Sequence, residues 1–143
     1  MKKFYLLVVI FVVTIGALIY SNHQQQLHVY QTDVHAHDIQ MNNLTLVNAD
    51  DTLYLPGTYS IERLFDEPIN RVSITLSYKN ENIYDWVLSL DVLDVADDFG
   101  DTFIDHVTLD QDDVITVTIM YDKDGEEVAF DRDIVLKDIL KEE

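Results

Sequence analysis

The chain has no cysteine, and only 4 Gly and 2 Pro occur among its 143 residues. The lack of cysteine excludes disulfide bonds, thiolate zinc sites and thiol nucleophiles. Few glycines and prolines, with 48% hydrophobic and 25% charged residues, indicate a folded protein rather than a disordered or repetitive one. A chain of this length is expected to form one folded domain.

Basic residues are also scarce: 9 Lys and Arg stand against 27 Asp and Glu, which gives a formal net charge of -18. Proteins that hold the phosphates of DNA or RNA need clustered cations, so the charge argues against nucleic-acid binding. A protein partner of so acidic a chain is expected to have a basic surface. Its binding is expected to weaken as salt is added.

One long hydrophobic segment lies at the start of the chain. Residues 4–20, which follow Lys2 and Lys3, contain no charged side chain. As a helix they would cover roughly 25 Å, near the lower limit for crossing a bilayer. Signal peptidase needs two small residues before its cleavage site, and Ser21 supplies only one of them. We therefore predict an uncleaved transmembrane helix over residues 1–20, and the alternative is a secreted protein whose signal peptide is removed.

The position of the two lysines predicts the orientation of this anchor. Because they precede the hydrophobic segment, the N-terminus is expected in the cytoplasm and the remainder outside it. The exported part comprises a polar tether over residues 21–26 and an acidic domain over residues 27–143. Exported domains without cysteine are commoner in Gram-positive bacteria than in eukaryotes, which favours a bacterial cell-membrane protein.

Alternation of hydrophobic and polar residues with a period of two dominates the exported part. The pattern predicts hairpins over residues 70–95 and 114–136, with turns at residues 79–82 and 122–125, and a bulge near Leu93 and Val95. Residues 27–36 and 44–55 are predicted to form two or three strands. Phe103, Val107 and Leu109 are predicted to share one core-facing side of a strand. A single helical turn is predicted at residues 60–65, ended by Pro68.

About seven short strands separated by turn signals indicate an all-β protein. The predicted fold is an immunoglobulin-like antiparallel β-sandwich, preceded by the N-terminal transmembrane helix. A sandwich fold does not by itself imply a particular function.

The first candidate site is a metal site at Asp33, His35 and His37. On an extended strand these three side chains point to the same side. Two imidazoles and a carboxylate suit zinc or copper(II). The competing interpretation is a pair of surface histidines, because Tyr30, Val34 and Ala36 would occupy the buried side of the same strand.

The second candidate site is a calcium site in the acidic segment that contains Asp97, Asp98 and Asp101. Carboxylate-rich loops outside the cell can hold calcium with millimolar affinity. The residues do not match the spacing of a helix-loop-helix calcium site. The simpler interpretation is that Asp is favoured in turns.

Signals for catalysis are missing from the sequence, which has no nucleophile elbow, no phosphate-binding loop and no dinucleotide fingerprint. We therefore predict a binding or interaction module without catalytic activity or cofactor. The alternative is an exported metal-binding protein that uses Ca, Zn or Cu. Tyr54, Tyr59, Tyr84 and Trp86 are the aromatic residues that would bind a partner if they were exposed, although a core position is favoured for Trp86.

Overall fold

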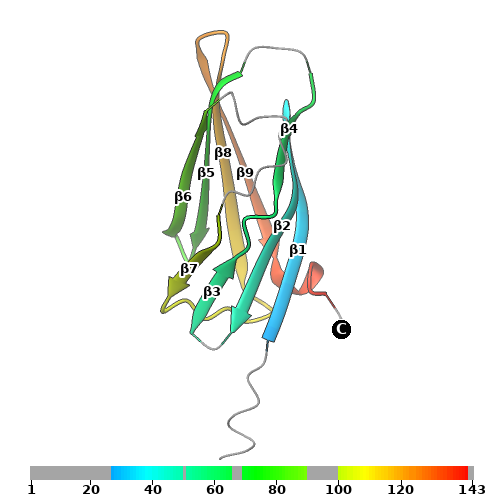
Figure 1. Ribbon diagram of the computed structural model, residues 1–143, viewed down its shortest axis with the longest axis vertical. Coiled ribbons are helices and arrows are strands. Elements are labelled where there is room, and N and C mark those ends of the chain that lie inside the picture. Colours follow the sequence, from blue (N-terminus) through cyan, green and yellow to red (C-terminus); the bar gives the residue numbers. More distant parts are fainter. Residues whose placement is uncertain (1–26, 50, 66–68, 90–99, 142–143) are drawn as a thin grey trace, which may run out of the picture.

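The computed structural model describes residues 27–49, 51–65, 69–89 and 100–141. In these residues all the strands belong to two antiparallel sheets. Figure 1 shows the two sheets as two layers that run along the long axis of the molecule. The prediction of an all-β sandwich is therefore confirmed.

The first layer, sheet A, has the strand order β1-β2-β3-β7, and β4 pairs with β2 on the same side as β3. Its strands are β1 (Leu27–Ala36), β2 (Ile39–Ala49), β3 (Thr52–Leu55), β4 (Ser60–Arg63) and β7 (Thr102–Asp105). The predicted strand at residues 27–36 is confirmed. The second strand begins at Ile39, five residues earlier than residue 44, where the alternation suggested its start.

The second layer, sheet B, has the order β6-β5-β8-β9. It comprises β5 (Ile69–Tyr78), β6 (Glu81–Ser89), β8 (Val114–Lys123) and β9 (Glu126–Val135), and a short 3-10 helix, η2 (Leu136–Asp138), follows β9. Both predicted hairpins are confirmed over the described residues. Each turns through two residues with positive φ, Lys79–Asn80 and Asp124–Gly125. The bulge predicted near Leu93 and Val95 lies outside the described residues.

The core lies between the two sheets and is built from the inward-facing positions of their strands. Every second residue is buried from Val72 to Leu76 on β5 and from Ile115 to Tyr121 on β8, as the alternation in the sequence predicts. The buried hydrophobic residues include Tyr30, Val34, Ile39, Met41, Leu44, Leu46, Leu53, Ile61, Val72, Ile74, Leu76, Trp86, Ile115, Val117, Ile119, Tyr121, Ile134 and Leu136. Trp86 is 9% exposed, so the core position favoured for it is confirmed.

The predicted helical turn at residues 60–65 is wrong, because Ser60–Arg63 forms strand β4. Strands β3 and β4 pair with the same strand, β2, at registers that differ by one residue. They are therefore two halves of one interrupted strand, separated at Pro56 and Gly57. Ile61 becomes fully buried opposite Met41, and this burial outweighs the weak helical pattern.

The prediction that Phe103 faces the core with Val107 and Leu109 is also wrong. Phe103 is 68% exposed, whereas Val107 and Leu109 are buried. His106 adopts a φ of 63°, which interrupts the extended conformation between the two groups. The alternation therefore changes phase at His106, and the Phe103 side chain lies on the outer face of sheet A.

Contacts between the sheets close both sides of the sandwich. On one side, the guanidinium of Arg132 on β9 donates to the carbonyl of Asp33 on β1 at 3.2 Å. The C-terminal segment also pairs with β1, where the backbone N–H of Gln31 donates to the backbone carbonyl of Ile139 at 3.0 Å. On the other side, the Thr102 hydroxyl on β7 donates to the Tyr84 hydroxyl on β6 at 3.1 Å.

The predicted transmembrane segment, residues 4–20, lies outside the described residues. Within the described residues, no helix is long and apolar enough to cross a membrane. Strand β1 begins at the lower end of the molecule in Figure 1, and Lys141, the last described residue, pairs with Val29 near the same end.

Candidate functional site: an exposed hydrophobic row on sheet A

Asp33 and His35, two of the three predicted metal ligands, lie on the exposed side of β1, opposite the buried Val34 and Ala36. The Asp33 carboxylate accepts a hydrogen bond from the backbone N–H of Asn43 at 2.8 Å. Asn43 has a φ of 60° and lies where β2 has one residue more than β1. Asp33 therefore supports a bulge in the neighbouring strand.

His37, the third predicted ligand, lies in the turn between β1 and β2 rather than on the strand. Its ring packs edge-on against Phe130 of β9, with 5.5 Å between the ring centroids. Within the residues that the structure describes, no group of three His, Asp or Glu side chains could hold a metal ion.

The second predicted metal site falls only partly on described residues. Asp97 and Asp98 lie outside them. Asp101 is exposed, and its carboxylate accepts a hydrogen bond from the Gly57 amide at 3.2 Å. Asp101 therefore joins the segment before β7 to the interruption between β3 and β4.

The four aromatic residues named as binding anchors divide into two groups. Tyr59 and Trp86 are buried and in ring contact, with 5.5 Å between centroids, and Tyr84 packs against Trp86 at 4.8 Å. Tyr54 lies on the opposite face of its strand from the buried Leu53 and is partly exposed. Tyr54 is therefore the one of the four on the outer face of sheet A.

A row of hydrophobic side chains crosses the outer face of sheet A at right angles to the strands. Strand pairing places Val29 beside Val47, Val47 beside Tyr54, and Tyr54 beside Phe103. Val29, Val47 and Tyr54 are partly exposed, and Phe103 is 68% exposed. We call Val29, Val47, Tyr54 and Phe103 the hydrophobic row. It spans four adjacent strands, β1, β2, β3 and β7.

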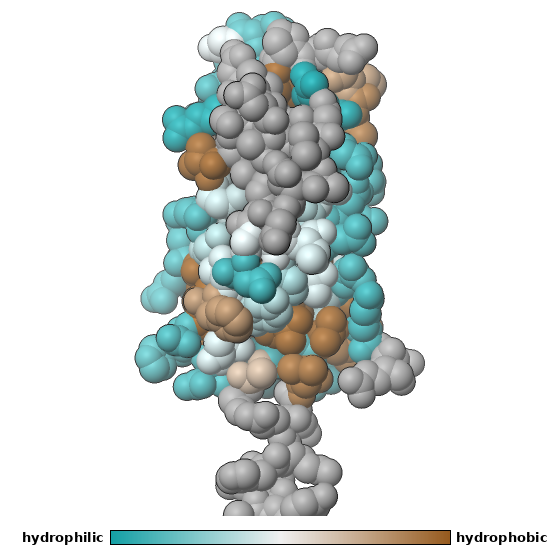
Figure 2. Space-filling model, viewed as in Figure 1, coloured by the Kyte–Doolittle hydropathy of each residue, from teal (hydrophilic) through white to brown (hydrophobic). Residues whose placement is uncertain are grey.

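The aromatic end of the hydrophobic row stands out from the sheet. The rings of Tyr54 and Phe103 are stacked, with 4.7 Å between centroids and 21° between planes. This distance matches the spacing of neighbouring strands, so both rings stand upright on the sheet. They form a ridge rather than a flat platform. Figure 2 shows hydrophobic surface toward the lower end of the molecule, where Figure 1 places β3, β7 and the start of β1.

Acidic residues surround this ridge. Asp101 and Asp105 lie two residues before and after Phe103, and both are exposed. Asp51, in the turn between β2 and β3, has a 71% exposed side chain. The sequence contains no Lys or Arg between Lys3 and Arg63 or between Lys79 and Lys123. Strands β3 and β7, which carry Tyr54 and Phe103, come from these two segments, so carboxylates surround the aromatic end of the hydrophobic row. At its other end, the backbone N–H of Lys141 donates to the Val29 carbonyl at 2.8 Å.

The outer face of sheet B has a different chemistry. Its central hydroxyl groups donate short hydrogen bonds to carboxylates on the outer strands, from Thr75 to Asp85 at 2.6 Å and from Thr118 to Asp131 at 2.6 Å. Thr116 bonds Asp133 in the same way at 2.7 Å. These side chains satisfy one another and present a hydrated surface.

Two of the hollows on the surface are lined by described residues. One is lined by Arg71, Ser73, Met120, Tyr121, Asp122 and Glu127. The other is lined by Tyr78, Lys79, Asn80, Asp112, Asp113, Val114, Thr116 and Asp133. In the second, the Tyr78 hydroxyl donates to the Asp113 carboxylate at 2.7 Å, and the Lys79 ammonium lies 4.5 Å from the Tyr78 ring. Neither lining contains a histidine that could activate a hydroxyl nucleophile.

Sequence reasoning found Tyr54 but assigned Phe103 to the core. One local signal could have corrected this: Asp101 and Asp105 share the face of Phe103 at a spacing of two residues, which indicates solvent. The hydrophobic row itself has no local signal, because its members come from strands that are paired only in the folded chain.

No protein-family model, curated protein or solved structure matches this chain.

Proposed function

We propose that this chain is an extracytoplasmic interaction module, anchored in the cell membrane by residues 4–20, that binds a protein with a basic surface and catalyses no reaction. The observation that carries the proposal is the hydrophobic row with the exposed Phe103 at its end. Exposed aromatic side chains beside other apolar side chains are typical anchors of protein interfaces. The surrounding carboxylates favour a partner that supplies cations at the rim.

The strand order supports the immunoglobulin-like assignment within this proposal. In such sandwiches strands A, B and E share one sheet, and C′, C, F and G share the other. Strands β2, β3 with β4, and β7 correspond to A, B and E, while β6, β5, β8 and β9 correspond to C′, C, F and G. Strand β1 is an addition before A. Such domains recognise partners through sheet faces, edges or loops without any reactive residue.

The location is tested on the full chain with a C-terminal tag in a bacterial host. Protease added to intact cells is expected to remove the tag, and the chain is expected in the membrane fraction. The matched control is Ile10→Arg, which places a charge in the middle of residues 4–20 and is expected to reduce membrane retention. A tag protected in intact cells would contradict the proposal.

The interaction is tested by affinity purification of the full chain from solubilised membranes. A protein retained by the wild type at low salt is expected to be lost with Phe103→Asp and with added salt. The matched control is Val87→Asp, because Val87 is 54% exposed on sheet B, away from the hydrophobic row. Equal retention by both variants would show that the row is not the binding surface.

A further inference from the structure

We infer that the partner of the hydrophobic row is itself held at the membrane and presents an apolar groove flanked by lysine or arginine side chains. This inference rests on the proposed function, and it adds the class of partner and the place where the two proteins meet. Three observations carry it: the shape of the row, its charge, and its distance along the chain from residues 4–20.

The shape of the row favours a partner surface with a groove. The stacked rings of Tyr54 and Phe103 project from the sheet, and β7 is the last strand of sheet A in the pairing order. One face of the Phe103 ring contacts Tyr54, and its other side points past the edge of the sheet. A projecting aromatic edge buries most area when it enters a groove lined by apolar side chains.

The carboxylates near the aromatic end of the row favour lysine or arginine side chains around that groove. Asp105 lies beside Phe103 on β7, and Asp51 lies at the end of the neighbouring hairpin. A second copy of this chain is disfavoured as the partner, because two chains of net charge -18 repel each other. An anionic lipid surface is disfavoured for the same reason.

The short distance along the chain between residues 4–20 and strand β1 favours a partner that is held at the membrane. The tether, residues 21–26, reaches at most roughly 20 Å. Leu27, the first residue of β1, is 55% exposed and lies two residues before Val29 on the same face of the strand. With strand spacings added, Phe103 lies no more than roughly 40 Å from the bilayer interface. A groove on a neighbouring membrane protein is therefore within reach at high local concentration.

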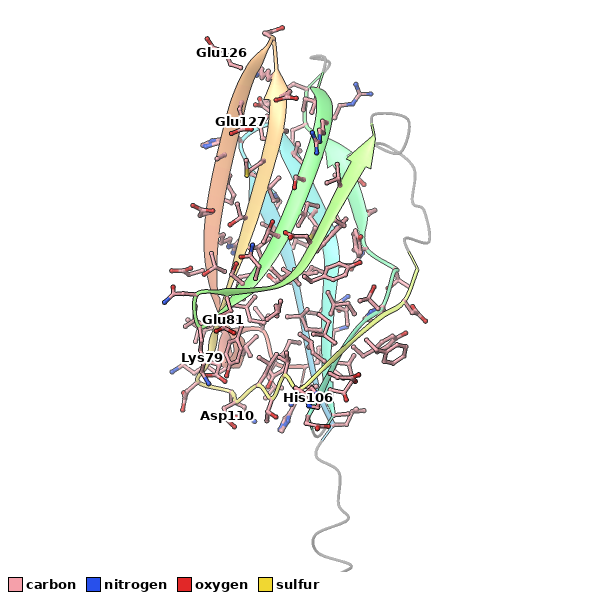
Figure 3. The ribbon with its side chains drawn as sticks, turned by 90° about the vertical axis from the view of Figure 1, so that its left-hand side faces the viewer. Lys79, Glu81, His106, Asp110, Glu126 and Glu127 are labelled. Atoms are coloured by element: carbon pink, nitrogen blue, oxygen red, sulfur yellow. The ribbon has the colours of Figure 1, made fainter. Side chains whose placement is uncertain are left out.

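The opposite end of the sandwich exposes two other hydrophobic side chains, Leu64 at 42% and Phe65 at 60%, next to the turn that contains Asp38. Figure 3 shows Glu126 and Glu127 at the β8–β9 turn, at the far end of the molecule from His106 and Asp110. The His106 imidazole lies 3.9 Å from the Asp51 carboxylate, and Asp51 follows the end of β2, where Ala49 pairs with Leu27. His106 and Leu27 therefore lie at the same end of the sandwich. The hydrophobic row therefore belongs to the end of the domain nearest the tether.

The test places the photoreactive residue p-benzoylphenylalanine at position 103 of the full chain in intact cells, with Ala129 on sheet B as the control position. Irradiation is expected to give an adduct from position 103, and not from 129, whose second component is an integral membrane protein. Its cross-linked peptide is expected to contain an apolar segment flanked by Lys or Arg. Adducts with a soluble protein, with lipid or with a second copy, equal yields at both positions, or no adduct would overturn the inference.

Two further variants test charge and distance. Asp105→Lys is expected to reduce the adduct yield at least fivefold, whereas Glu127→Lys, with the same change of net charge at the far end, is expected to leave it unchanged. Inserting 20 Gly and Ser residues after Gln26 is expected to lower the yield by up to about ninefold, since effective concentration falls with tether length. A soluble partner would be insensitive to the insertion. If the C-terminal tag is protease-sensitive but position 103 gives no such adduct, the inference fails and the extracytoplasmic location stands.

Discussion

The hydroxyl of Tyr121 on β8 donates a hydrogen bond of 2.7 Å to the carboxylate of Asp38 in the turn between β1 and β2. The ammonium group of Lys123 donates to the same carboxylate at 3.0 Å. The two donors come from sheet B and the acceptor from sheet A. The Asp38 side chain is only 15% exposed. This contact therefore joins the two layers at the end of the sandwich opposite Leu27, the first residue of β1.

Two Tyr→Phe substitutions should differ in their effect on stability. Tyr121→Phe removes one donor from Asp38 and is expected to lower the free energy of unfolding by about 1–2 kcal/mol. Tyr30→Phe is the matched control, because the buried Tyr30 hydroxyl has no hydrogen-bond partner. Its removal is expected to leave stability unchanged or to raise it. Urea denaturation measures both free energies of unfolding. Equal losses in the two variants would contradict a stabilising hydrogen bond from Tyr121 to Asp38.

Asp38 should also control stability at acid pH. The Tyr121 hydrogen bond and then Lys123 hold the pKa of Asp38 below its ordinary value. The stabilisation is therefore present above the ordinary pKa, near 4, and is lost as pH falls through the lower folded value. Asp38→Asn is expected to be less stable than the wild type at pH 7, with the difference shrinking below about pH 4. Urea midpoints at pH 7, 5 and 3 measure this, and Asp112→Asn, with a 90% exposed side chain, is the control.

Gly57 should tolerate no side chain. A Cβ at this position would lie 2.5 Å from the backbone nitrogen of Gly100 and 2.7 Å from its carbonyl oxygen. Backbone atoms cannot move aside cheaply, so Gly57→Ala is expected to destabilise the domain by about 1–3 kcal/mol. Thr58→Ala, at the exposed neighbouring position, is expected to change stability by less than about 0.5 kcal/mol. Equal thermal midpoints for the two variants would contradict this packing.

Phe103 should contribute little to folding. Its contact with Tyr54 is the main loss in Phe103→Ala, which is expected to cost less than about 1.5 kcal/mol. Leu53→Ala removes a fully buried side chain from the neighbouring strand and is expected to cost about 2–5 kcal/mol. A loss in the free energy of unfolding as large for Phe103→Ala as for Leu53→Ala would contradict the exposed position of Phe103. A small cost makes the variant suitable for binding experiments.

The single Trp should report on the core. Trp86 packs against Tyr59 and Tyr84, and its indole nitrogen has no hydrogen-bond partner. Its fluorescence is expected to be blue-shifted and poorly quenched by the neutral quencher acrylamide in the folded protein, and red-shifted in urea. The unfolding midpoint from this signal should match that from far-ultraviolet circular dichroism. Strong quenching of the native protein would contradict the buried position.

The regular strands could be predicted because their signal is local. In β5 and β8 the inner residues alternate with hydroxyl-bearing ones, and the turns at Lys79–Asn80 and Asp124–Gly125 contain residues that adopt positive φ readily. Packing against β2 decides the conformation of residues 60–63, whose short pattern fits a helix or a strand equally well. A left-handed φ at His106 reverses the faces on either side of it, which alternation alone cannot foresee.

The amino-acid sequence by itself determined the acidity of this protein, its lack of thiol chemistry, its hydrophobic segment at residues 4–20 and its all-β class, because composition and short-range periodicity are properties of the chain. Only the tertiary structure decided that Val29, Val47, Tyr54 and Phe103 stand in one line. They come from four strands separated by up to 74 residues, and their alignment is set by backbone pairing between strands. Such an alignment exists only once those strands are hydrogen-bonded in register.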